Sequence, residues 1–99
     1  MTTELLALDG LIDAQTMARQ HPTTYEVPDD QELADISVGD CVKVCRCDER
    51  FWILITETSA RYLVGEVNSQ LIAPDNLPLK VGQLVRFERR HVFAADPVS

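Results

Sequence analysis

Between residues 38 and 93 the sequence alternates short runs of strand-forming residues with clusters of turn-forming residues. Five runs are rich in apolar, aromatic and β-branched side chains, and they cover residues 40–47, 51–56, 61–67, 71–74 and 84–93. Short runs at this spacing are typical of small all-β domains. The sequence therefore predicts five strands in a small barrel or a strongly bent sheet, with a bulge or bend at Gly65.

Two of the predicted strands are preceded by the same short sequence pattern. The segments ISVGDCVKV (36–44) and LKVGQLVRF (79–87) both place a Val-Gly turn just before a strand. Gly39 and Gly82 supply the backbone freedom that such a turn needs. Because this pattern is common in SH3-like barrels, the expected fold is mainly β, with a small five-stranded SH3-like barrel.

The chain is expected to be a single domain, because 99 residues suffice for one hydrophobic core but not for two. Its expected parts are a helical preface, an extended acidic arm, the SH3-like barrel and a frayed tail, over residues 1–21, 22–37, 38–93 and 94–99. No apolar run is long enough to span a membrane, and the N-terminus lacks the basic region of a signal peptide. We therefore expect no membrane association and a cytoplasmic location.

The preface is predicted to be a helix over residues 3–20, with its apolar residues on one stripe. Thr2 or Thr3 can cap it, and Pro22 ends it. Gly10 weakens its middle, so two short helices are the alternative. A single helical turn is also predicted within the acidic arm, over residues 29–35.

Cys41, Cys45 and Cys47 lie at alternate positions of the first predicted strand. They should therefore share one face with Lys43, about 7 Å apart from one to the next. Structural zinc sites instead use cysteines two to four residues apart on a turn that curls around the metal. We expect no metal site here, and we interpret the cysteines as small buried or half-buried side chains of the sheet.

The net charge of −7 is concentrated in the first part of the chain. Residues 1–40 contain nine acids and one base, whereas residues 41–99 contain seven acids and eight bases. Such an acidic surface should repel nucleic acid and anionic membranes. The candidate acidic face consists of Asp29, Asp30, Glu32 and Asp35; a solvated, solubilising surface is the simpler interpretation.

The only tryptophan, Trp52, follows Arg50 at the start of the second predicted strand. A cation beside an indole could bind a ligand by stacking or cation–π contact. The structural alternative is that Trp52 or Phe51 packs in the core, with the helix or residues 21–28 covering the Trp52 side. Both faces of this strand are apolar, which favours the structural alternative and leaves the exposure of Trp52 open.

A second candidate binding surface lies on the last predicted strand, and it consists of Arg86, Arg89, Arg90 and His91. These arginines, with a nearby aromatic residue such as Tyr62, could contact nucleic acid as small barrels do. The alternative that we prefer is that they pair with the acidic N-terminal segment and dock it on the barrel. A single histidine on an apolar face is more often a hydrogen-bonded core residue than a catalyst.

Five segments resemble, in order, a family of small uncharacterised bacterial domains. The segments are MARQHPTTYEVP, VGDCVKV, ERFWILITE, YLVGEVN and VRFERRHVF, which span about residues 17–93. The most specific matches are Glu49-Arg50-Phe51-Trp52 and the pair of Phe87 with His91. The resemblance implies an SH3-like fold and brings no established activity, and residues 3–16 lie outside it.

The sequence contains no serine-hydrolase, phosphate-loop or zinc-protease motif. We therefore expect a non-enzymatic binding or adaptor module that needs no cofactor and acts through contacts with another protein. Two alternatives stay open: a nucleic-acid-binding barrel that uses the C-terminal arginines, and an acidic mimic of nucleic acid that inhibits a basic protein. The oligomeric state is left undetermined.

Overall fold

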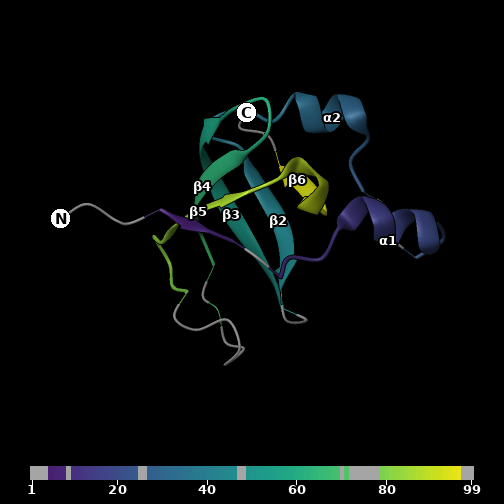
Figure 1. The fold of residues 1–99 in the computed structure, drawn as a ribbon, viewed down its shortest axis with the longest axis horizontal. Helices are drawn as coiled ribbons and strands as arrows, with labels where there is room; N and C mark the ends of the chain where they lie inside the picture. Colours follow the sequence, from purple (N-terminus) through teal and green to yellow (C-terminus); the bar gives the residue numbers. More distant parts are fainter. Residues whose placement is uncertain are drawn as a thin grey trace.

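The computed structural model contains a six-stranded mixed sheet (Figure 1). The structure describes residues 5–8, 10–24, 27–46, 49–69, 71 and 79–96. Its elements are β1 (Leu6–Ala7), α1 (Ala14–Gln20), α2 (Asp30–Ala34), β2 (Cys41–Arg46), β3 (Glu49–Thr58), β4 (Leu63–Val67), β5 (Leu84–Phe87), the 3₁₀ turn η2 (Arg89–His91) and β6 (Ala94–Asp96).

The strands lie in the order β1-β5-β4-β3-β2-β6, antiparallel except for the parallel pair of β1 with β5. The mainly-β prediction is confirmed. The sheet differs from the expected five-stranded barrel, because it has six described strands and its two edge strands, β1 and β6, do not pair with each other. The two additional edge strands come from segments predicted to be helix and tail.

One hydrophobic core lies on the inner side of the sheet. Alternation directs Val42 and Val44 of β2 inward, opposite Ile53 and Phe51 of β3. The same core contains residues of β5, although β3 and β4 separate that strand from β2. Residues of β3 and β4 belong to the same core and connect the two strands.

The ladder between β3 and β4 is irregular near the glycine of β4. The register between β3 and β4 shifts between Ile55 and Glu57, and Ile55 pairs with Gly65. A Cβ atom at Gly65 would collide with the backbone carbonyl of Leu54 and the side chain of Ile53. The register shift beside this glycine confirms the predicted bulge or bend, and the close approach of the two backbones leaves no room for a Cβ atom at residue 65.

The N-terminal segment differs from the predicted helix over residues 3–20. Residues 6–7 form β1, which pairs with β5, and the amide of Leu8 donates to the carbonyl of Arg86 at 2.9 Å. Gly10 has a φ of 72°, a left-handed value that stops a helix. The helix begins after Asp13, whose carboxylate accepts from the Thr16 amide at 3.0 Å. The predicted caps at residues 2 and 3 lie outside the described residues.

The acidic arm contains the predicted helical turn. Helix α2 starts at a capping box, in which Asp29 accepts from the Glu32 amide and Glu32 accepts from the Asp29 amide. Leu33 and Ile36 anchor the arm in the core. Within the described ranges, neither helix has the length and hydropathy that a bilayer-spanning segment requires.

The C-terminal segment is not the single strand predicted over residues 84–93. Strand β5 ends at Phe87, η2 turns the chain, and the predicted frayed tail supplies β6 over residues 94–96. Val92 and Phe93 are buried after the turn, which carries the chain to the edge of β2. The predicted strand over 71–74 cannot be compared, because residues 72–74 lie outside the described part.

Candidate binding surfaces

The cysteines of β2 lie on the outer side of the sheet. Cys45 is buried beneath α1, in a second apolar cluster with Ala14 and Phe93, and Cys41 is half-buried. The interpretation as small sheet-wall side chains is confirmed for these two residues, and Cys47 lies outside the described residues. Among the described histidines, cysteines and carboxylates, no group of three or more could hold a metal ion.

Trp52 lies on the same outer side, opposite Lys43 across the β2–β3 ladder. The Nζ atom of Lys43 lies 5.3 Å from the centroid of the Trp52 ring, a cation–π contact. The indole is half-buried, and it is not among the residues packed in either apolar cluster. The structural alternative, that Trp52 or Phe51 packs in the core, is confirmed for Phe51, whereas Trp52 is neither in the core nor fully exposed.

Arg50 is exposed and lies opposite Cys45, two positions before Trp52 on β3. Its guanidinium carbon lies 5.7 Å from the centroid of the Phe93 ring. Because α1 covers Cys45 and Phe93, Arg50 stands at the margin of the covered region. We call the adjoining surface the Trp52 face, and it consists of Lys43, Arg50, Trp52 and Leu54.

Backbone contacts hold the Trp52 face in place. The Trp52 amide donates to Ser69 Oγ at 3.0 Å, and its carbonyl accepts from the Asn68 amide at 2.8 Å. Leu54 is half-buried and pairs with Glu66 of β4, which in turn pairs with Leu84 of β5. The apolar surface of Trp52 and Leu54 is thus bounded on the β4 side by the exposed Glu66, which lies between Leu54 and Leu84.

Arg89 donates hydrogen bonds to three backbone carbonyls. Its Nε donates to Leu33 O at 3.2 Å, and its Nη1 donates to Ser59 O at 2.6 Å and to Ala60 O at 3.4 Å. One side chain thereby ties the end of α2 to the hairpin between β3 and β4. This arrangement gives Arg89 a structural role.

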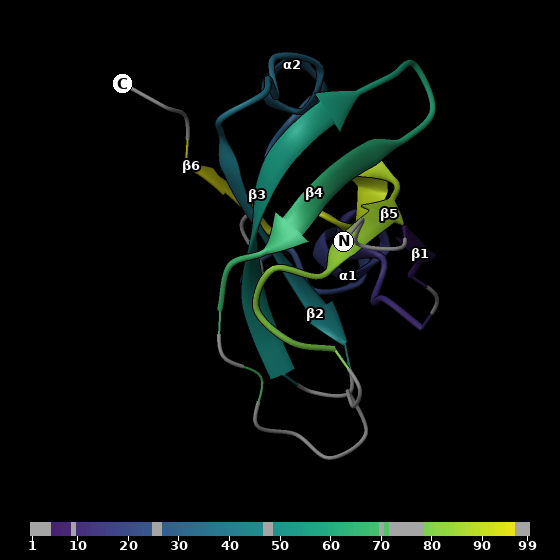
Figure 2. The same cartoon turned by 90° about the vertical axis from the view of Figure 1, so that its left-hand side faces the viewer.

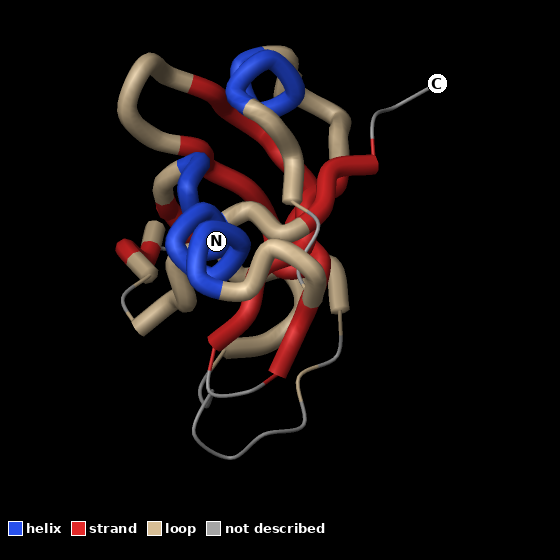
Figure 3. The backbone as a smooth tube through the Cα atoms, turned by 90° about the vertical axis from the view of Figure 1, so that its right-hand side faces the viewer, coloured by secondary structure: helices blue, strands red, loops and turns tan. Residues whose placement is uncertain are grey.

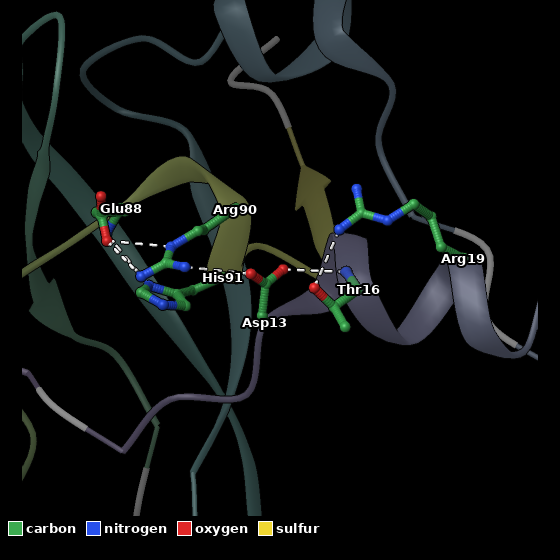
Figure 4. A network of polar contacts seen from close by, with 6 residues as sticks. All are labelled: Asp13, Thr16, Arg19, Glu88, Arg90 and His91. Carbon is green, nitrogen blue, oxygen red and sulfur yellow. Dashed lines mark hydrogen bonds and ion pairs between the residues drawn. The ribbon is translucent and has the colours of Figure 1, made fainter.

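Arg90 faces the N-terminal segment (Figure 4). Its guanidinium pairs with Glu88 at 2.9 Å and with Asp13 at 3.3 Å. The predicted pairing of a C-terminal arginine with an N-terminal acid is confirmed for Arg90. Burial alone would raise the pKa of Asp13, but the Thr16 amide and the charge of Arg90 together hold that pKa below its ordinary value. The contact joins α1 to η2, which lie side by side in Figure 3.

His91 is buried, and its Nδ1 accepts from the Glu88 amide at 3.3 Å. Burial lowers the pKa of His91, and the positive charge of Arg90 lowers it further. These features fit a neutral, hydrogen-bonded residue that closes η2.

Arg86 lies apart from these two arginines. Its guanidinium carbon is 4.7 Å from the centroid of the Tyr62 ring, and that of Arg61 is 5.6 Å from the same centroid. The predicted C-terminal basic surface is therefore divided among three places. Sequence analysis missed Arg61, because only the pairing of β4 with β5 shows that Arg86 lies at the same ring.

The acids of the candidate acidic face also separate. Asp29 caps α2, and Asp30 lines a hollow beside Arg89. Glu32 and Asp35 line another hollow, which includes the buried Asp40. Sequence analysis missed Asp40, whose carboxylate accepts from the Ser37 amide at 2.8 Å.

Neither protein-family models, nor curated proteins, nor solved structures matched this chain. The resemblance to the family of small bacterial domains therefore stays a prediction.

Proposed function

We propose that this protein is a non-enzymatic binding module that recognises another protein through the Trp52 face. One observation carries the proposal: the only tryptophan is half-buried on an outer strand surface and packs in neither apolar cluster. Tryptophan is enriched among the residues that contribute most to protein–protein binding. The exposed part of the indole offers a partner an apolar contact.

The surroundings of the indole suit such a role. Leu54 extends the apolar surface, while Lys43 and Arg50 place positive charges beside it. An apolar centre with a charged rim is the usual anatomy of a protein interface. The ring is already oriented by Lys43 and by the backbone contacts of Trp52, so that little ordering would be needed on binding.

The test compares Trp52→Ala with Tyr62→Ala, a change at another half-buried aromatic residue. Partners captured from the producing cell by the wild-type protein are identified, and one is purified for titration. We expect Trp52→Ala to lose that partner while its thermal unfolding stays near that of the wild type, and Tyr62→Ala to retain it. Loss of the partner only together with unfolding would refute the proposal.

Nucleic-acid binding is a second candidate, favoured by the two guanidinium groups at Tyr62. No carboxylate pairs with Arg61 or Arg86 among the described residues. A labelled single-stranded oligonucleotide at low salt is the probe, and a double change of both arginines to alanine should abolish its binding. Absence of any binding by the wild-type protein would end this candidate.

Inhibition of a basic protein by mimicry of nucleic acid is a third candidate. It rests on the acids of α2 and its cap, Asp29, Asp30, Glu32 and Asp35. Neutralising the exposed Asp30 and Asp35 together should weaken such a complex. A complex that is insensitive to this change and to salt would exclude mimicry.

We also propose that β2 to β6 are the strands of an SH3-like unit. The order β6-β2-β3-β4-β5, the bend at Gly65 and the shared core of β2 and β5 support this assignment. Strand β1 would then be an addition at the edge, consistent with the resemblance beginning near residue 17.

A further inference from the structure

Strand β6 forms one edge of the sheet (Figure 2). It pairs with β2 on one side over Ala94, Ala95 and Asp96. On its other side, no described backbone group bonds to these three residues. An edge strand with unpaired amides and carbonyls can accept a further strand from another chain.

Two hollows adjoin this edge. One has a volume of about 280 Å³ and is lined by Glu32, Asp35, Ile36, Asp40 and Ala95. The other, of about 290 Å³, is lined by Val27, Pro28, Glu32, Phe93, Ala94 and Ala95. They share Glu32 and Ala95, and we call the two adjoining hollows together the groove between α2 and β6. The small side chains of Ala94 and Ala95 leave room for a backbone to approach.

The charges of the groove have one sign. Glu32, Asp35 and Asp40 are acidic, and no base is among the lining residues. Asp96 adds a fourth acid at the end of the strand. A concave surface lined by one sign of charge attracts ligands of the opposite sign.

We propose that the groove between α2 and β6 binds an extended basic segment of another protein, which adds to the sheet beside β6. Backbone hydrogen bonds to β6 would supply the general affinity, and the two hollows would select side chains. A lysine or arginine suits the hollow of Glu32 and Asp35. An apolar side chain suits the hollow of Val27, Pro28 and Phe93.

This groove adjoins the Trp52 face, because Phe93 contacts Arg50 and Ala94 pairs with Lys43, but different residues line it. Its lining residues come from residues 27–40 and 93–95, whereas the Trp52 face consists of residues of β2 and β3. Binding at the two surfaces can therefore be tested separately. Trp52→Ala should leave peptide binding at β6 unchanged.

The probe is a fluorescein-labelled eight-residue peptide of alternating lysine and valine, titrated by anisotropy against the full chain. We expect binding that protects the amides of β6 from hydrogen exchange. A glutamate–valine peptide tests the charge. A lysine–valine peptide N-methylated at alternate amides tests strand pairing, because it keeps the charge and loses backbone donors. Both should bind about tenfold more weakly or worse.

Asp35→Lys and Asp30→Lys form a matched pair of variants. Both reverse one exposed charge at α2, but only Asp35 lines the groove. We expect Asp35→Lys to weaken lysine–valine binding about tenfold and Asp30→Lys to change it less than about twofold.

If Asp35→Lys and Asp30→Lys lost equal affinity for the lysine–valine peptide, the attraction would be general and electrostatic. If the N-methylated peptide bound as tightly as the unmodified one, no strand would be added to the sheet. No binding of the lysine–valine peptide would refute the proposal directly. A dimer in sedimentation, with β6 amides protected in the absence of peptide, would make a second copy of this chain the occupant.

Discussion

Arg90 and Asp13 are 77 positions apart in the sequence, yet Arg90 Nη1 lies 3.3 Å from Asp13 Oδ2. Asp13 also caps α1 through the Thr16 amide, and Arg90 also binds Glu88 within η2. A single carboxylate thus starts one helix and joins it to the turn before the last strand.

Two substitutions separate the stability that Asp13 contributes as the cap of α1 from the stability that it contributes through its ion pair with Arg90. Asp13→Ala should lower the free energy of unfolding by about 1 kcal/mol, because it removes the cap of α1. Asp13→Asn should cost much less, since asparagine caps helices well and exposed ion pairs contribute little. Urea unfolding followed by Trp52 fluorescence measures both. If the two variants lose equal stability, the ion pair and not the cap is the stabilising contact.

Acid should weaken the same contact. The pKa of Asp13 is lowered in the folded protein from the ordinary value of 3.8. Its stabilising contribution is therefore complete above pH 3.8 and is lost as the pH falls through the folded value. The difference in stability between wild type and Asp13→Asn should shrink over that range; a constant difference would contradict the lowered pKa.

His91 should make stability depend on pH in a higher range. Because its pKa is lowered on folding from 6.5, the unfolded chain binds the proton more readily. The free energy of unfolding should therefore be highest above pH 6.5 and fall as the pH drops from there toward the folded value. His91→Asn keeps an acceptor for the Glu88 amide and removes the titration, so it should flatten this dependence. An unchanged pH profile in that variant would assign the dependence to other groups.

Arg89 should matter more for stability than the other arginines. Arg89→Ala removes three hydrogen bonds to carbonyls of α2 and the β3–β4 hairpin, and we expect a loss of about 2 kcal/mol. Arg61→Ala is the matched control, and it should stay within about 0.5 kcal/mol of the wild type. Urea unfolding of both variants distinguishes them. Similar stabilities would show that the carbonyls are satisfied equally well by water.

Two glycines should respond differently to alanine. Gly65→Ala places a Cβ against the Leu54 carbonyl and Ile53, so we expect a loss of about 3 kcal/mol or more. Gly82→Ala meets open space, but its φ of 92° should cost about 1 kcal/mol. Thermal unfolding checks the order of the two variants, and a reversed order would contradict the close contact between β3 and β4.

The central strands could be predicted because their information is local. The runs of β-branched and apolar residues in 41–46 and 51–56 predict strands whatever the rest of the chain does, and the structure then shows which face of each is buried. A period of two identified the cysteines as residues of one strand face. Gly65 marked the bend, since only glycine permits that approach of two backbones.

The candidate sites were less predictable. The sequence identified Trp52 and the arginines as residues of interest, but it could not assign their roles. Arg86, Arg89 and Arg90 are close in the chain, and they contact respectively an aromatic ring, backbone carbonyls and carboxylates. Each arginine has a partner 20 or more positions away, although Arg90 also pairs with Glu88, so local spacing alone could not assign the three roles.

By itself, the sequence determined a small acidic β-rich domain with one apolar core and the positions of its central strands. Only the tertiary structure decided the edges. Residues 6–7 and 94–96 have little strand character of their own, and they become β1 and β6 because β5 and β2 present backbone groups that need partners. Strand formation at an edge depends on a neighbour that folding brings from elsewhere in the chain, and a linear pattern does not contain that neighbour.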